Sequence, residues 1–157
     1  RCFDELEYLN IDVLGMKGKS RVINIPDDRK QLWKQIENAL RNPVIRRFVL
    51  REDMKLEKKA GISALCEYSL LSDNVYPTYA VTKRELKDSG VKVEKQVSEL
   101  EESGCVVLEL GYFIDFLGKG FQDPLSVVLS LTGEEQEEER VDISINEMLE
   151  EYVWSKD

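Results

Sequence analysis

The sequence predicts an α+β protein in which the end of one domain precedes a mixed α/β domain. Two short β-prone stretches with glycines between them lie near the start of the chain. Helical and strand-type apolar patterns then alternate, and a long amphipathic pattern over residues 141–152 closes the chain. We therefore expect residues 1–26 to be the end of a first domain. Residues 27–157 should form an α/β domain with about four strands and a C-terminal amphipathic helix.

The first 26 residues have the pattern of a helix end followed by a two-stranded ribbon. Apolar residues recur at helical spacing over residues 2–9. Two short strands are expected at 13–14 and 21–25, the second with alternating side chains. Gly15 and Gly18 permit the tight reversal between them. This order predicts a helix that leads into a β-ribbon with a glycine-bearing tip.

The next predicted elements are a helix, a strand and a second helix. Asp27-Asp28 after a proline is a helix-start signal, and the apolar stripe runs to about residue 40. Asn42-Pro43 ends this helix. Residues 44–51 alternate like a strand, and residues 62–71 have the pattern of a mostly buried helix.

The middle of the domain continues with a β-prone segment over residues 76–81. Thr82 and Glu85 have the spacing of a capping box, which predicts a short helix ending near Gly90. Residues 91–103 fit a helix and a strand equally, and both alternatives stay open.

The last third of the sequence has the pattern of a β-hairpin and two helices. Residues 105–110 have a clear strand pattern, and we expect residues 112–117 to pair with them across a turn at Gly111. Asp123-Pro124 predicts an N-cap and an N1 proline for a short buried helix. The acidic run at 134–139 is interpreted as a solvated first helical turn, favoured by the helix dipole.

Charge is divided unevenly along the chain. Residues 1–59 contain 14 Lys/Arg and 10 Asp/Glu, a net charge of +4, whereas residues 60–157 contain 8 and 21, a net charge of −13. The total of −9 opposes nucleic-acid binding by the whole surface, so a contact with DNA must be local to the basic end.

Composition also limits the cellular context. No apolar run is long enough to span a bilayer, and the start has no secretory pattern. The chain does not begin with Met, so we expect it to be a piece of a longer protein. Cys2, Cys66 and Cys105 are odd in number and widely spread, which predicts reduced thiols and a cytoplasmic location.

The sequence favours binding over catalysis. It contains no His, no Cys-x-x-Cys pair and no phosphate-loop motif, so we expect no cofactor, no metal site and no catalytic residues. A carboxylate or metal enzyme would need Asp73, Glu85 and Glu109 to converge in one cleft. We expect these three residues to be scattered.

The predicted ribbon supplies the candidate DNA contacts, which are Lys17, Lys19, Ser20 and Arg21. Glycines let the backbone approach a phosphate, a serine hydroxyl can donate a hydrogen bond to it, and long cations can enter a narrow minor groove. The alternative is an ordinary polar hairpin turn, because turns that contain glycine and lysine are common.

Two other groups of residues have ordinary structural explanations. Arg46, Arg47 and Arg51 are expected to face solvent and pair with the acidic body of the domain. Three tyrosines could line a ligand pocket, but we expect core-edge positions with solvated hydroxyls. They are Tyr68, Tyr76 and Tyr79.

The order of these signals resembles the C-terminal part of a bacterial MarR-like winged-helix regulator, and is also similar to antitoxin-type regulators of abortive-infection systems. Residues 1–25 resemble the end of a recognition helix and its wing. The rest of the resemblance rests on Leu32-Trp33-Lys34, Leu40-Arg41-Asn42-Pro43-Val44, Ala60-Gly61-Ile62-Ser63-Ala64-Leu65, Tyr76-Pro77-Thr78-Tyr79-Ala80-Val81, Asp123-Pro124-Leu125-Ser126-Val127-Val128-Leu129-Ser130-Leu131 and Glu139-Arg140-Val141.

The resemblance implies a cytoplasmic transcriptional regulator that binds duplex DNA through the wing. Its acidic C-terminal domain would sense a signal, dimerise or bind a partner. Most of the recognition helix would then precede Arg1. The alternative is an antitoxin-like interaction module whose acidic domain holds a partner protein. A contiguous acidic or apolar patch within residues 60–157 would favour this alternative.

Overall fold

The structure is a computed structural model that describes residues 14–17, 20–23, 27–50, 56–74, 76–91, 104–116 and 118–155, the first two ranges by their backbone. The chain divides into two compact units, residues 1–41 and 42–157. The expected domain boundary after residue 26 stays a prediction. The helix predicted over residues 2–9 lies outside the described ranges.

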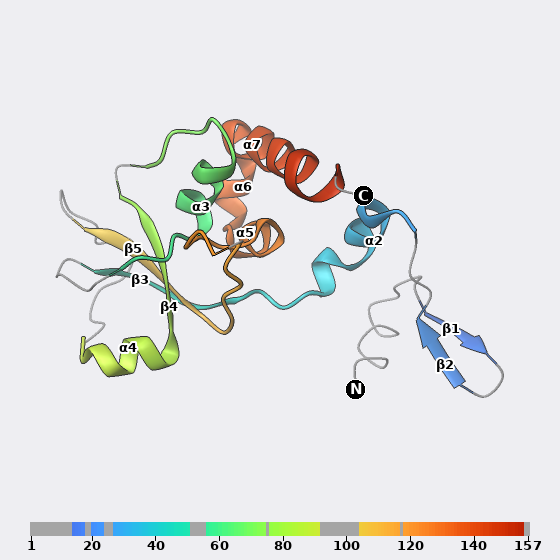
Figure 1. The fold of residues 1–157 in the computed structure, drawn as a ribbon, viewed down its shortest axis with the longest axis horizontal. Helices are drawn as coiled ribbons and strands as arrows, with labels where there is room; N and C mark the ends of the chain where they lie inside the picture. The colour runs from blue at the N-terminus through green and yellow to red at the C-terminus, as the bar shows by residue number, and fades with distance from the viewer. Residues whose placement is uncertain are drawn as a thin grey trace. The chain divides into compact units, whose positions relative to one another are not determined.

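The first unit contains a two-stranded ribbon, as predicted, and one helix. Gly15, which was expected in the reversal, lies instead within the first strand, opposite Val22. Strands β1 (Leu14–Lys17) and β2 (Ser20–Ile23) pair antiparallel, with Lys17 opposite Ser20 (Figure 1). Helix α2 (Arg29–Ile36) begins where the Asp28 side chain accepts a hydrogen bond from the Lys30 amide at 2.9 Å. A 3₁₀ turn, η1 (Glu37–Ala39), continues it, so the helix predicted to reach about residue 40 is confirmed.

The second unit is built on a three-stranded mixed sheet in the order β3-β5-β4. Strand β5 (Cys105–Leu110) is central and pairs antiparallel with β3 (Val44–Leu50) and parallel with β4 (Thr78–Thr82). The α+β class is therefore confirmed. About four strands were expected in this unit, and the described residues form a sheet of three.

The strand predicted over residues 112–117 is wrong for the residues that the structure describes, 112–116, which form only one isolated bridge, Asp115 to Gln122. The reason is the position of β5, because β3 and β4 already occupy both of its edges. The Gly111 amide donates instead to the Pro43 carbonyl at 2.8 Å, and the chain leaves the sheet there. Alternation along one segment could not reveal that its neighbour had no free edge.

Short-range signals place the helices accurately. Thr82 and Glu85 form the predicted capping box on α4 (Lys83–Ser89). Asp123 caps α5 (Pro124–Ser130), with Pro124 in the first turn. Helices α3 (Gly61–Tyr68) and α7 (Glu139–Leu149) also belong to this part, and the π-helical turn η3 (Glu150–Trp154) follows α7 directly.

The acidic run at 134–139 is helical and solvated, as predicted, but it is divided between two helices. Thr132 caps α6 (Gly133–Glu137) through a second capping box with Glu135. Glu138 then adopts an extended backbone conformation and begins α7. The Thr132–Glu135 spacing was the local signal for this break, since a capping box marks a helix start.

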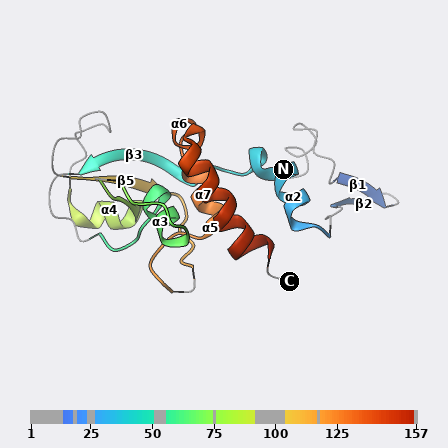
Figure 2. The same cartoon turned by 90° about the horizontal axis from the view of Figure 1, so that it is seen from above.

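The main hydrophobic core lies between α3, α5 and α7, which group together in Figure 1 and stay side by side in Figure 2. Val127 and Met148 are fully buried there. Helix α4 covers the opposite face of the sheet, where Leu86 packs with Phe48 and Val107. No helix among the described residues is long and apolar enough to cross a membrane.

A buried glutamine joins helices α3 and α5. The Gln122 side chain is fully buried, accepts from the Gly61 amide at 3.2 Å and donates to the Ser130 hydroxyl at 2.8 Å. Its main-chain carbonyl accepts from the Tyr68 hydroxyl at 2.6 Å. Because every polar partner here is satisfied internally, this network fixes the packing of α3 against α5.

Candidate functional site

The predicted DNA contacts lie around the end of the β1–β2 ribbon. Lys17 ends β1, Ser20 begins β2, and Arg21 is opposite Met16. Lys19 lies outside the described residues. The backbone register leaves residues 18 and 19 as the connection between the strands, which brings Lys17 and Ser20 close together. Contact of these residues with DNA stays a prediction.

Two of the three arginines on and after β3 pair with acidic residues, as expected. The Arg46 guanidinium lies 3.2 Å from the Glu109 carboxylate and 5.4 Å from the centre of the Phe48 ring. Arg47 donates to the Ser130 carbonyl at 3.0 Å and pairs with Glu135 at 3.4 Å. Arg51 lies outside the described residues. These contacts make Arg46 and Arg47 structural residues of the second unit.

The three carboxylates considered for a metal or acid–base site serve different local contacts. Asp73 accepts from the Ser63 hydroxyl at 2.9 Å, and Glu109 pairs with Arg46. Glu85 pairs with the Lys58 ammonium at 2.5 Å, and this hydrogen bond lowers the pKa of Glu85. No group of three or more His, Cys, Asp or Glu in the described part of the chain could hold a metal ion.

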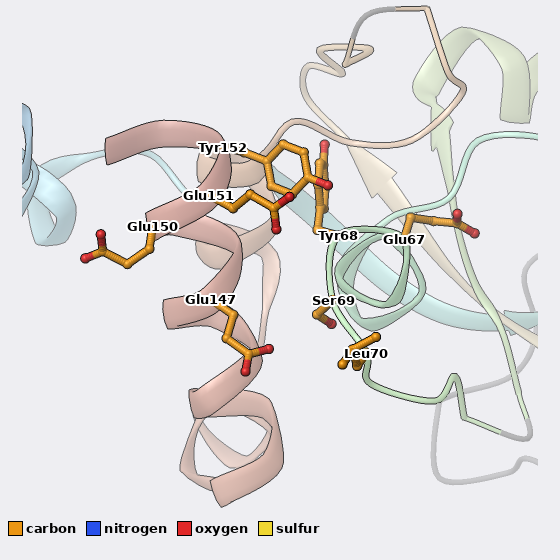
Figure 3. Close-up of a pocket in the computed structure, with 8 residues that line it drawn as sticks. All are labelled: Glu67, Tyr68, Ser69, Leu70, Glu147, Glu150, Glu151 and Tyr152. Carbon is orange, nitrogen blue, oxygen red and sulfur yellow. The ribbon is translucent and has the colours of Figure 1, made fainter. Parts of the chain in front are cut away.

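The described residues form an open groove where the end of α3 faces the end of α7 and the turn η3 (Figure 3). Its volume is about 680 Å³. We call it the acidic groove, because half of its lining residues are glutamates and none is Lys or Arg. It is lined by Glu67, Tyr68, Ser69, Leu70, Glu147, Glu150, Glu151 and Tyr152.

The wall of the acidic groove has an aromatic part. The rings of Tyr68 and Tyr152 meet edge to face, with centroids 5.1 Å apart, and Phe116 packs against both. The Tyr68 hydroxyl is bonded to Gln122 in the core, so the expectation of a solvated hydroxyl is wrong for this residue. Burial raises the pKa of the Tyr68 phenol, with a further rise from Asp123.

The glutamates of the groove differ in direction and in pairing. Glu147 and Glu151 are four residues apart and extend from α7 and η3 toward the end of α3, whereas Glu150 extends from another side of the helix (Figure 3). Glu67 pairs with Lys59. Neither Glu147 nor Glu151 forms an ion pair with any residue that the structure describes. These two carboxylates therefore supply the open negative charge.

One apolar residue completes the groove. Leu70 lies two residues after the end of α3, and it is 97% exposed, the most of any large apolar residue in the described ranges. A leucine that buries no surface contributes nothing to the core, so its place beside the carboxylates is a feature of the surface.

Sequence reasoning singled out Tyr68 but missed the groove. The C-terminal sequence predicts an apolar stripe, and this stripe packs into the main core through Val141, Ile145 and Met148. The polar face of the same helix holds the groove glutamates. Spacing of four residues between Glu147 and Glu151 was the available signal, but it did not indicate that the end of α3 lies opposite.

Comparisons with protein families, with curated proteins and with solved structures found no match for this chain. The winged-helix resemblance therefore stays a proposal. The features of this chain that bear on its function are the ribbon, the charge distribution and the acidic groove.

Proposed function

We propose that the protein is a DNA-binding transcriptional regulator of the MarR-like winged-helix kind, acting in the bacterial cytoplasm. The observation that carries the proposal is the antiparallel pairing of β1 with β2, which leaves a connection of two residues between Lys17 and Ser20. A short ribbon with cations at its tip is the form of a wing. Its backbone and side chains can contact phosphates and a narrow minor groove.

The charge distribution supports the same assignment. The net charge of −13 on residues 60–157 repels the DNA backbone, whereas residues 1–59 carry +4. Contact with phosphates is consequently favoured at the N-terminal end alone. Such contacts release counterions, so binding through the ribbon depends strongly on salt.

A fluorescence-anisotropy titration of the full-length protein against duplex DNA, at several salt concentrations, tests this proposal. We expect Lys17→Ala with Lys19→Ala and Arg21→Ala to weaken binding at least about tenfold on all sequences. The salt dependence should become shallower by about three counterions. The reason is the loss of up to three phosphate contacts.

The matched control removes three exposed cations from α4, with Lys83→Ala, Arg84→Ala and Lys87→Ala. Both triple variants change the net charge equally, so a general charge effect would weaken them alike. Equal weakening, or binding unaffected by the ribbon substitutions, would place the DNA contact elsewhere. Absence of DNA binding by the full-length protein would end the proposal.

The second candidate function is an antitoxin-like interaction module that holds a partner protein through its acidic domain. The observation that favours it is the acidic groove, because it places unpaired carboxylates and an exposed leucine on one surface of residues 60–157. A pull-down with the groove intact and with Leu70→Ser tests whether that surface retains a partner.

A further inference from the structure

We propose that the acidic groove recognises an arginine or lysine that stands beside an apolar side chain in an exposed segment of a partner protein. This inference rests on the second candidate function, partner binding, and names the chemistry of the partner. Three independent properties of the groove carry it: the negative charge, the aromatic wall and the exposed leucine.

The first property is the negative charge of Glu147 and Glu151, which form no ion pair with any residue that the structure describes. The C-terminal end of α3 lines the groove, and α3 has no basic residue in its last turn. Helix C-termini carry partial negative charge from unsatisfied carbonyl groups, which cations normally compensate. The Glu147 and Glu151 carboxylates add to this partial charge, so the complementary ligand is a cation.

The second property is the aromatic wall beside these carboxylates. Tyr68 and Tyr152 line the groove with their ring centroids 5.1 Å apart. Tyr68 is only 4% exposed, so the half-buried Tyr152 is the ring that a ligand can reach. Faces of tyrosine rings attract ammonium and guanidinium groups. Contacts of Tyr68 with Phe116 and Phe121 hold its ring in place, so the wall is preformed. A planar guanidinium that stacks on a ring can also reach a carboxylate with two donors, which favours arginine over lysine.

The third property is Leu70, which is 97% exposed at the edge of the same groove. An isolated cation, such as a metal ion or a polyamine, would leave this side chain in water. A peptide that carries an apolar residue beside its cation would bury it. Nucleic acid does not fit this surface, because the Glu147 and Glu151 carboxylates repel phosphates and the groove lining has no Lys or Arg.

Fluorescence-anisotropy titrations with three labelled peptides test the inference. The first peptide alternates arginine and leucine, the second replaces each leucine with serine, and the third replaces each arginine with glutamate. We expect the whole protein to bind the first peptide best, the second more weakly, and the third not measurably.

Variants then locate the site. Glu147→Gln with Glu151→Gln should weaken the first peptide about five- to tenfold, since partly exposed ion pairs are lost. Leu70→Ser should weaken the first peptide and leave the affinity for the second unchanged. The matched control is Glu134→Gln with Glu137→Gln, because both residues are exposed on α6 outside the groove lining and the change in net charge is the same.

The possible failures are distinguishable. Equal weakening by the α6 control would overturn the inference, because the attraction would then be a general property of an acidic protein. Preference for the glutamate peptide, lost on Leu70→Ser, would overturn the cation assignment while leaving partner binding in place. Absence of binding by all three peptides, together with a pull-down that Leu70→Ser does not change, would overturn both.

Discussion

Two parts of the second unit hold their carboxylates in different ways. Around the sheet, Glu109 is 6% exposed and paired with Arg46, and the Glu85 carboxylate pairs with Lys58 and accepts from the Thr82 amide at the start of α4. In the acidic groove, Glu147 and Glu151 have no ion pair among the described residues. The difference teaches that the carboxylates of the first part pair internally and stabilise the fold. In the second part the charge remains available for recognition.

The largest effect should follow from breaking the pair at Glu109. Arg46→Met leaves a carboxylate unpaired at a buried position and should destabilise the protein by about 2 kcal/mol. Replacing both residues, Arg46→Met with Glu109→Leu, should restore most of this loss because no buried charge remains. Urea unfolding of the single and double variants measures both values. A double variant no more stable than the single one would contradict the assignment of Glu109 to the fold.

A smaller effect on stability is expected when low pH protonates the Glu85 carboxylate. Its pKa lies below the ordinary value of 4.5, so the pair with Lys58 stabilises the folded state above the pKa of the unfolded chain. This contribution is lost as pH falls through the lowered pKa, from about pH 5 downward. Because the side chain is 42% exposed, solvent screens the pair and the contribution is about 0.5 kcal/mol.

Urea midpoints across this pH range test the Glu85 prediction. Lys58→Met should make the loss of stability on acidification smaller, since it removes the main cause of the lowered pKa. Arg84→Met is the control, because its pair with Asp88 is 3.9 Å long and exposed. An unchanged pH profile for Lys58→Met would show that the pair is not coupled to folding.

The smallest effect on stability should come from the groove. Leu70→Ser, and Glu147→Gln with Glu151→Gln, should each change the free energy of unfolding by less than about 0.5 kcal/mol. The glutamine pair could only relieve repulsion between like charges four residues apart. Thermal unfolding followed by circular dichroism measures this. A loss above about 1 kcal/mol would make these residues part of the fold and remove the contrast with Glu109.

Local signals predicted much of the fold because they act within one turn of chain. Asp28, Thr82 with Glu85, and Asp123 with Pro124 each begin a helix at the expected place. Side-chain oxygens satisfy amides only two or three residues away, so no other part of the protein is needed. The presence of the ribbon followed from alternation and nearby glycine for the same reason, although Gly15 lies in β1 and not in the turn.

The candidate sites were predictable to different degrees. The ribbon residues are contiguous in sequence, so their proximity followed from the hairpin itself. The acidic groove joins residues 67–70 to residues 147–152, which no local pattern connects. Tyr68 illustrates the same limit, because its hydroxyl is bonded to the Gln122 carbonyl, far along the chain.

By itself, the sequence determined the α+β class, the starts of α2, α4 and α5, the ribbon and the separation of charge, since composition and short-range hydrogen bonds decide these features. The tertiary structure alone decided that β5 is central, so that residues 112–116 have no edge to join. It also decided that the ends of α3 and α7 meet around unpaired carboxylates. Both outcomes depend on which distant segments pack together, and that choice is made by burial of the shared core rather than by any single segment.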